Sequence, residues 1–163
     1  MGNRILARFV RGLGDKAADI GHRERLSRQA RGLARLGSLI PDRVADAAAH
    51  AAGEDAHGLN AVFAHADVVL TPLFTRRPPL VRRYAGRPAL PTLLTMVRLA
   101  PYPGAFNHTG QPAVSVPAGF AADGFPLAAQ LVGPPDSEAL LVRLAAQLER
   151  HTGWPAHIPK AAV

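Results

Sequence analysis

The strongest constraint on the fold lies in the last third of the chain, where two apolar runs flank a turn signal and precede a helical pattern. The runs are AVSVPA (residues 113–118) and PLAAQLVG (residues 126–133), and Asp123-Gly124 stands between them. Short apolar runs around an Asp-Gly pair predict a β-hairpin, although the loop is longer than the tight two-residue type. Leucines then recur at helical spacing, with Asp136 or Ser137 as the cap and Gly153 as the stop.

The first two thirds of the chain are dominated by helical patterns. Residues 4–20 and 23–36 have amphipathic spacing, and a long alanine-rich helix is expected from Asp42 to about Ala66, with a break near Gly53 or Gly58 as an alternative. The short apolar run DVVLT (residues 67–71) predicts a buried strand. Residues 72–103 are rich in Pro and Arg and show little periodicity, so a connecting loop is predicted there. A chain of 163 residues suggests one domain, residues 1–163.

Composition excludes several classes of protein. The chain has no cysteine, so it cannot form disulfides or thiolate metal sites, and no apolar run is long enough to span a membrane. A cytoplasmic protein is therefore the default expectation. The net charge is +7, and residues 76–100 carry six arginines and no acid. The basic blocks contain few aromatic residues and no RNA-binding or zinc-finger signature, so no nucleic-acid partner is expected, although a basic nucleic-acid-binding protein remains an alternative.

The histidines do not have the spacing of a metal site. His50, His57 and His65 are separated by seven and eight residues, which places successive rings about 10 Å or more apart along a helix. A solvated helix face explains this pattern better than a set of ligands. No metal and no cofactor are expected.

The hydroxyl residues do not form a recognisable nucleophile. The chain has four serines, namely Ser27, Ser38, Ser115 and Ser137. Ser115 is flanked by valines and lacks the glycine-bounded turn that exposes a catalytic serine. His108 is the nearest base in sequence for Ser115 or Thr109, but sequence proximity is the only support for such a pair. No catalytic residue is predicted in this chain.

Three blocks follow one another in the second half: FNHTGQPAVSVPAGF (106–120), DGFPLAAQLVG (123–133) and EALLVRLAAQLE (138–149). In this order they resemble the C-terminal part of the amidase signature family. The residues that match are Phe106, Asn107, Thr109, Gly110, Pro112, Ala113, Ser115, Val116, Pro117, Gly124, Pro126, Gln130, Val132, Gly133, Trp154 and Pro155. ARLGSLIPD (34–42) and HADVVLTP (65–72) also look like family segments.

The resemblance implies an α/β fold, with α/β/α layers around a mixed sheet of which this chain holds only a few strands. It also implies hydrolysis of carboxylic amides to an acid and ammonia or an amine, by a Ser nucleophile, a second Ser and a Lys base. The family places these groups in its N-terminal half. The chain has no Ser-Ser pair, and neither Lys16 nor Lys160 matches the motif. We therefore expect residues 1–163 to be a partial domain, the C-terminal portion of an amidase, that is inactive alone.

The same resemblance implies two groups of residues. One group is expected to form part of the wall of a substrate pocket, and the other belongs to a family motif with a structural role. The pocket-wall residues are Phe106, Asn107, Thr109 and Gly110, and the motif residues are Pro112, Ser115, Pro117, Gly124, Pro126, Gln130 and Gly133. An alternative interpretation is that Asn107, Thr109 and Gly110 only shape a loop, while Val114 and Val116 pack in the core.

Three functions stay open at this point. The first is the C-terminal segment of an amidase, which would bind a small amide only after completion by an N-terminal half. The second is a non-catalytic partner subunit of a split amidase or amidotransferase, and the third is the basic nucleic-acid-binding protein. Since the sheet would continue into the absent half, an exposed apolar edge and self-association or a partner chain are expected.

Overall fold

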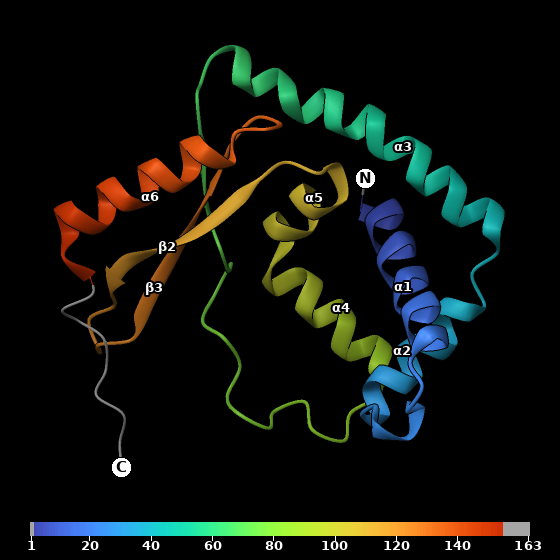
Figure 1. Ribbon diagram of the computed structural model, residues 1–163. Coiled ribbons are helices and arrows are strands. Elements are labelled where there is room, and N and C mark those ends of the chain that lie inside the picture. Colours follow the sequence, from blue (N-terminus) through green and yellow to red (C-terminus); the bar gives the residue numbers. More distant parts are fainter. Residues whose placement is uncertain (1, 155–163) are drawn as a thin grey trace. The chain divides into compact units, whose positions relative to one another are not determined.

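A computed structural model of the chain describes residues 2–154 and divides into two compact units (Figure 1). The first unit consists of residues 2–59 and 74–109 and is helical. The second consists of residues 60–73 and 110–154 and contains the sheet and the last helix. The expectation of one partial domain spanning the whole chain is not tested by this division, because compact units of this size also occur within one domain.

The first unit is built from five α-helices. They are α1 (Gly2–Asp19), α2 (Arg28–Ser38), α3 (Asp42–Asn60, of which the last residue belongs to the second unit), α4 (Ala89–Leu99) and α5 (Pro101–Thr109), with a short 3-10 helix η1 at Arg23–Arg25. Ser27 caps α2, because its side-chain oxygen accepts a hydrogen bond from the Ala30 amide at 3.1 Å. The helix expected from residue 42 is present. It runs unbroken through Gly53 and Gly58, since its many alanines offset the low helix propensity of glycine.

Helices α1 and α2 cross at a pair of glycines. A Cβ atom on Gly14 would lie 2.9 Å from the carbonyl carbon of Gly37, and a Cβ atom on Gly37 would overlap the carbonyl oxygen of Val10. Real Cβ atoms do not approach backbone that closely, so only glycine permits this separation. The two helices therefore pack backbone against backbone at this point.

The segment 72–103 contains a helix that the sequence analysis missed. Helix α4 occupies Ala89–Leu99, and the irregular part runs only from residue 73 to 88. Pro91 stands in the first turn of α4, where proline is tolerated because the amides there have no intrahelical partner. Leu90, Leu93 and Leu94 have the apolar spacing of a helix, but the prolines near them led to the prediction of a loop. The prediction of a connecting loop is thus wrong for residues 89–99.

The second unit contains a three-stranded antiparallel sheet in the order β1-β3-β2. The strands are β1 (Val69–Pro72), β2 (Ala113–Phe120) and β3 (Pro126–Val132), and a 3-10 helix η2 (Ala61–Ala64) precedes them. The hairpin predicted around Asp123-Gly124 is confirmed. Gly124 has a φ of 79°, and the Ala121 amide donates to the Phe125 carbonyl at 2.8 Å. Pro117 lies on the edge strand β2 beside a register shift, where no ladder hydrogen bond is lost.

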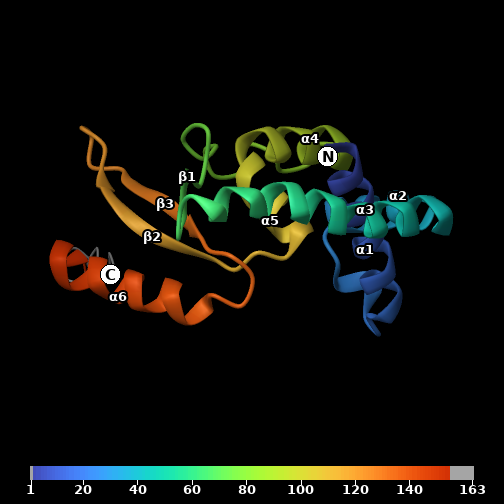
Figure 2. The same cartoon turned by 90° about the horizontal axis from the view of Figure 1, so that it is seen from above.

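Helix α6 (Glu138–Thr152) lies along one face of this sheet (Figure 2). Leu141 packs with Val116 and Leu131 in the core of the unit, and Leu144, Leu148 and Trp154 pack around them. Of the two candidates for the N-cap, Ser137 occupies the position, but its side chain makes no capping hydrogen bond. Gly153 ends the helix as predicted, in the left-handed conformation with a φ of 61°. Because register partners share a face, Val114, Val116, Ala129 and Leu131 turn toward α6.

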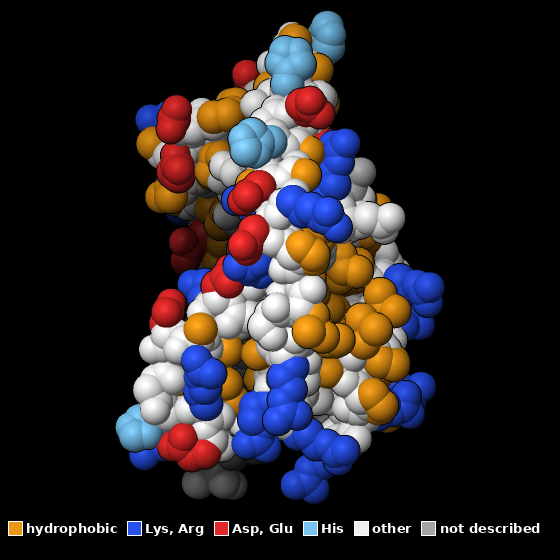
Figure 3. All heavy atoms as spheres, turned by 90° about the vertical axis from the view of Figure 1, so that its right-hand side faces the viewer, with side chains coloured by type: hydrophobic (Ala, Val, Ile, Leu, Met, Phe, Trp, Pro, Cys, Tyr) orange, Lys and Arg blue, Asp and Glu red, His pale blue; other side chains and the backbone are white. Residues whose placement is uncertain are grey.

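The chain therefore has a mixed α/β fold with a small antiparallel sheet. The α/β/α layers and the mixed sheet, expected for a complete family member, remain predictions. None of the helices in the described part of the chain is long and apolar enough to cross a membrane. Figure 3 shows one face of the molecule on which hydrophobic side chains gather beside basic ones. On α4, Leu90, Leu94 and Val97 are exposed in a single stripe.

Candidate functional site

The expected pocket-wall residues lie at the end of helix α5 rather than in a loop. Phe106 is buried and Asn107 is exposed, while the Thr109 hydroxyl donates to the Ala105 carbonyl one turn earlier at 2.9 Å. Gly110 follows the helix with a φ of 84°, a conformation that glycine adopts readily. The loop interpretation of Asn107 and Thr109 is thus wrong. Prolines 101 and 103 occupy the first turn, where they allow a helix to start.

His108 forms the most buried polar contact of the first unit. Only 2% of its side chain is exposed, and its Nε2 atom lies 3.2 Å from Oδ2 of Asp55 on α3. Arg4 on α1 lies 3.6 Å from the other carboxylate oxygen of Asp55. Arg8, one turn further along α1, donates to the backbone carbonyl of His108 at 2.7 Å. This network ties α1, α3 and α5 together.

The network was not found by sequence reasoning. Asp55 and His108 stand 53 residues apart, and nothing in the local pattern of either helix marks them as partners. Among the described residues, His108 Nδ1 is buried without a hydrogen-bond partner. His108 therefore faces a carboxylate, and the sequence-based pairing of His108 with a hydroxyl receives no support from its Nε2 contact.

A row of polar residues crosses the sheet on the face turned away from α6. Gln130 on β3 pairs in register with Thr71 on β1 and with Ser115 on β2. Gln130 is buried, and its Oε1 atom accepts a hydrogen bond of 3.3 Å from the Thr71 hydroxyl. Ser115 is exposed. Gln130 thus holds a side chain of the neighbouring strand β1.

The glycine and proline residues of the motif have geometric roles in the second unit. A Cβ atom on Gly133 would overlap the hydroxyl of Ser137, which donates to the Pro134 carbonyl at 2.6 Å. The Gly133 amide also donates to the Pro112 carbonyl at 3.0 Å, which holds the end of β3 against the start of β2. Pro126 begins β3 directly after the hairpin turn. Pro155 and Lys160 lie outside the described residues.

A second charged cluster surrounds Arg11 on α1. Its guanidinium donates to Asp15 at 2.8 Å, to Asp42 at 2.6 Å and to the Ile40 carbonyl at 2.9 Å. These hydrogen bonds, first that with Asp15 and then that with Asp42, raise the pKa of Arg11 above its already high ordinary value. Because a raised pKa stabilises the protonated form, the contribution to folding is present below the ordinary arginine pKa. It is lost only as the pH rises through the raised value.

The described residues hold no group of three side chains suited to a metal ion. His50, His57 and His65 are all exposed, in agreement with the solvated-face interpretation. The Nδ1 atom of His50 lies 2.8 Å from the backbone carbonyl oxygen of Asp46, one turn earlier on α3. The hydroxyl of Ser115 makes no side-chain hydrogen bond within the described residues.

Comparison with known proteins identifies the family. The family model described as Amidase matches residues 19–142, which include helices α2 to α5, the whole sheet and the block 106–120. The chain belongs to the amidase family. The match therefore includes parts of both units and most of the residues on which the resemblance was based, those from Phe106 to Gly133.

Two mycobacterial amidase relatives match nearly the whole chain. The protein named "Putative amidase AmiB2" of Mycobacterium tuberculosis is 40% identical over 157 residues, which is 96% of this chain and 34% of the relative. "Putative amidase AmiA2" of the same organism is 32% identical over 156 residues, which is 96% of this chain and 32% of the relative. The chain thus spans about a third of the length of these relatives.

Solved amidase structures share the fold. A 6-aminohexanoate cyclic dimer hydrolase complexed with substrate superposes with a TM-score of 0.75 at 21% identity, covering 93% of this chain and 36% of that enzyme. The allophanate hydrolase of Kluyveromyces lactis superposes with a TM-score of 0.63 at 20% identity, covering 82% of this chain and 21% of that enzyme. The fold is thus similar to part of each of these enzymes.

Proposed function

We propose that this chain is the C-terminal portion of an amidase that hydrolyses carboxylic amides, and that another polypeptide segment supplies the nucleophile and base. One observation carries the proposal: the 40% identity to AmiB2 extends over 96% of this chain but over only 34% of AmiB2. The sequence supports it as well, because the blocks that resemble the family belong to its C-terminal part and no Ser-Ser pair is present.

The proposed chemistry is acyl transfer through a serine. The serine oxygen attacks the amide carbonyl carbon, the C–N bond breaks, and the nitrogen leaves as ammonia or an amine after taking up a proton. Water then attacks the acyl-serine ester and releases the carboxylic acid. The Lys and second Ser would shuttle the protons. All three groups would come from outside the 163 residues, so we expect the chain alone to lack measurable amidase activity.

The role proposed for this chain is to complete the substrate pocket. Asn107 is the member of the block 106–110 best placed to meet a ligand, because it is exposed while Phe106 is buried and Thr109 bonds its own helix. Phe106 would hold α5 in the first unit. Gly110 would let the chain turn from the helix toward β2.

The test combines this chain with the segment that it lacks. The chain is produced alone, and also together with the part of AmiB2 that it does not match, expressed as a separate polypeptide. Ammonia release is measured on a panel of linear primary amides. Opening of a cyclic amide such as 6-aminohexanoate cyclic dimer is measured in parallel, since a hydrolase of that compound from Pseudomonas is 41% identical to this chain over 64 residues.

We expect no release by the chain alone and release by the combination. In the combination, Asn107→Ala should raise KM, whereas Arg143→Ala on the exposed face of α6 should leave it unchanged. Amide hydrolysis by the chain alone would overturn the proposal that the reactive groups lie elsewhere. Inactivity of a well-folded combination on every amide would count against the proposal as a whole.

The same proposal identifies the partner. The rest of an amidase, on the same polypeptide or on a second one, would cover the exposed apolar stripe of α4 and the exposed β1 side chain Leu70, which is 67% accessible. The non-catalytic subunit of a split amidase differs only in that the covering segment is a separate chain. Co-purification from the native source would reveal that arrangement.

A further inference from the structure

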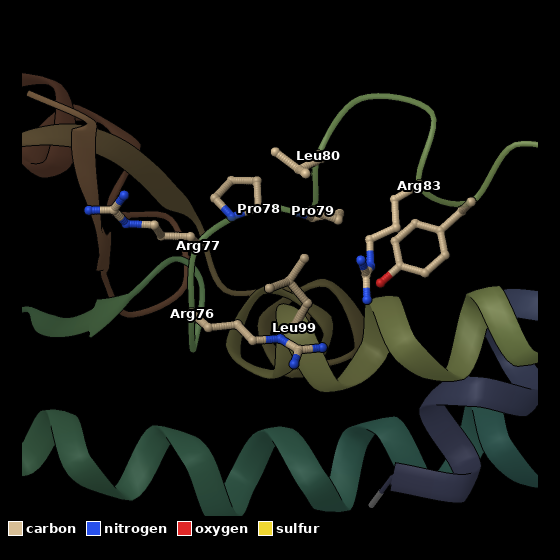
Figure 4. A pocket seen from close by; sticks show the side chains of 8 residues that line it. Arg76, Arg77, Pro78, Pro79, Leu80, Arg83 and Leu99 are labelled. Atoms are coloured by element: carbon tan, nitrogen blue, oxygen red, sulfur yellow. The ribbon is translucent and has the colours of Figure 1, made fainter. Parts of the chain in front are cut away.

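A hollow of about 270 Å³ lies in the first unit, where the irregular segment before α4 folds back over the end of that helix. Residues of the segment and one residue of α4 line it: Arg76, Arg77, Pro78, Pro79, Leu80, Arg83, Tyr84 and Leu99. In Figure 4 the side chains of Arg76 and Arg83 extend into the same space beside Leu99, while Arg77 is directed away from them. We call this site the arginine hollow.

The segment that forms the arginine hollow is anchored at three points. The Thr75 amide donates to the Leu99 carbonyl at 2.9 Å, which closes one end. At the other end, Gln29 of α2 donates from Nε2 to the Tyr84 carbonyl at 2.6 Å and to the Arg87 carbonyl at 3.3 Å. The Arg87 guanidinium also lies 5.7 Å from the centroid of the Tyr84 ring. The lining residues are thus held by the helices beneath them.

Two of the arginines that line the arginine hollow carry a charge that no acid compensates within the described residues. Neither Arg76 nor Arg83 forms an ion pair there, and residues 76–100 contain no acid. Arg11, by contrast, has two carboxylate partners. Two guanidinium groups that share a concave space repel each other, and a bound anion would relieve that repulsion. A guanidinium also presents paired N–H donors that match the two oxygens of a carboxylate.

Apart from the arginines, the lining is largely apolar. Pro78, Pro79 and Leu80 lie above the buried Leu99 in Figure 4, and Tyr84 adds an aromatic ring to the lining. A volume of about 270 Å³ is slightly below the range of pockets that hold drug-sized ligands. The site therefore suits a small molecule with one charged end and a short hydrocarbon body. A phosphate ion would satisfy the arginines but leave the apolar lining unfilled.

We propose that the arginine hollow binds a small monocarboxylate through Arg76 and Arg83, with the hydrocarbon part of the ligand against Leu99 and the prolines. The inference does not rest on the proposed function, because binding to the hollow requires no catalytic group. It adds a recognition site for organic acids, the class of compound that amide hydrolysis releases.

The experiment is an NMR titration of the full chain labelled with ¹⁵N, using sodium hexanoate as the probe. Hexanamide, which has the same shape without the charge, and inorganic phosphate are titrated in parallel. We expect saturable shifts from hexanoate at amides of residues 76–84 and 99, and weaker shifts from the other two compounds. Binding should weaken as sodium chloride rises from about 50 mM to about 500 mM, because the charges are exposed to solvent.

Two variants separate specific binding from general charge. Arg76→Gln combined with Arg83→Gln should weaken hexanoate binding about tenfold or more, since both charge-assisted contacts are lost. Arg35→Gln combined with Arg143→Gln removes two exposed arginines elsewhere and should leave the affinity unchanged. Equal binding of hexanamide, equal loss in both double variants, or shifts that do not saturate at residues 76–84 would overturn the proposal. None of these outcomes depends on whether the completed enzyme hydrolyses amides.

Discussion

His108 is almost fully buried at the end of α5, and its ring lies against a carboxylate that comes from α3. A buried polar group is stable only while its partners remain, because without them its desolvation is uncompensated. Asp55 is the central member of this network, since it faces Arg4 through one oxygen and His108 through the other. Its neighbour Glu54 is 80% exposed and lies 3.9 Å from Arg4. The two adjacent acids thus offer a matched comparison of a buried and a surface contact.

At this scale we predict that Asp55→Ala lowers the free energy of unfolding by about 1–3 kcal/mol, because His108 and Arg4 lose a shared partner in a largely buried place. Glu54→Ala should change it by less than about 0.5 kcal/mol, as is usual for an exposed ion pair. Both substitutions replace an acid by alanine within α3, and Asp55→Ala gains more helix propensity than Glu54→Ala, so a larger loss for Asp55→Ala cannot come from propensity. Urea denaturation followed by circular dichroism measures both values. Equal losses would show that the buried contact contributes nothing specific.

At the scale of elements, the first unit depends on the glycine crossing of α1 and α2. The closest approach involves the backbone of Gly14 and Gly37, and Gly37 is buried against Val10. A side chain at Gly37 would overlap backbone atoms of α1, and a backbone atom cannot move away by a change of rotamer. The helices would have to move apart and lose packing along their common length.

We predict that Gly37→Ala destabilises the chain by about 1–3 kcal/mol through this overpacking. Gly12→Ala lies on the partner helix α1 with open space around it, and should stabilise the chain by about 0.5–1 kcal/mol through higher helix propensity. Thermal unfolding followed by circular dichroism distinguishes the two signs. A Gly37→Ala variant as stable as the unmodified chain would contradict the close crossing.

At the scale of the whole molecule, the exposed apolar side chains are the feature that bears on association with other chains. Leu90, Leu94 and Val97 form a stripe along α4, and hydrophobic side chains are gathered on the face shown in Figure 3. Monomeric proteins seldom leave extended apolar patches uncovered. In the proposed amidase, the remaining segment would cover this stripe.

We therefore predict that the chain self-associates when it is produced alone. Size-exclusion chromatography with light scattering should give a mass above the 17.2 kDa of one chain, and the excess should grow with concentration. Leu90→Gln combined with Leu94→Gln should reduce the association. Val142→Gln, which removes an exposed side chain from α6, serves as the control. A monomer at high concentration would contradict the prediction.

Most of the second unit was predictable from the sequence. The Asp123-Gly124 turn, the two flanking runs and the glycine that ends α6 are signals between near neighbours, and the structure confirms the hairpin and helix α6 (Glu138–Thr152). The loop prediction failed in the first unit, where prolines 91, 101 and 103 led to a loop prediction for residues that fold as α4 and the start of α5. Proline breaks a helix only in its interior, so its position relative to the start of the helix decided the outcome.

The sequence by itself determined the local elements and the resemblance to the amidase family, because turn residues, helical periodicity and ordered motif blocks are properties of neighbouring positions. Only the tertiary structure decided which distant residues meet. Asp55 reaches His108, Gly37 meets the backbone of α1, and Arg76 and Arg83 share one hollow because separate segments pack at particular separations. Such contacts depend on long-range packing of the chain, to which no local pattern corresponds.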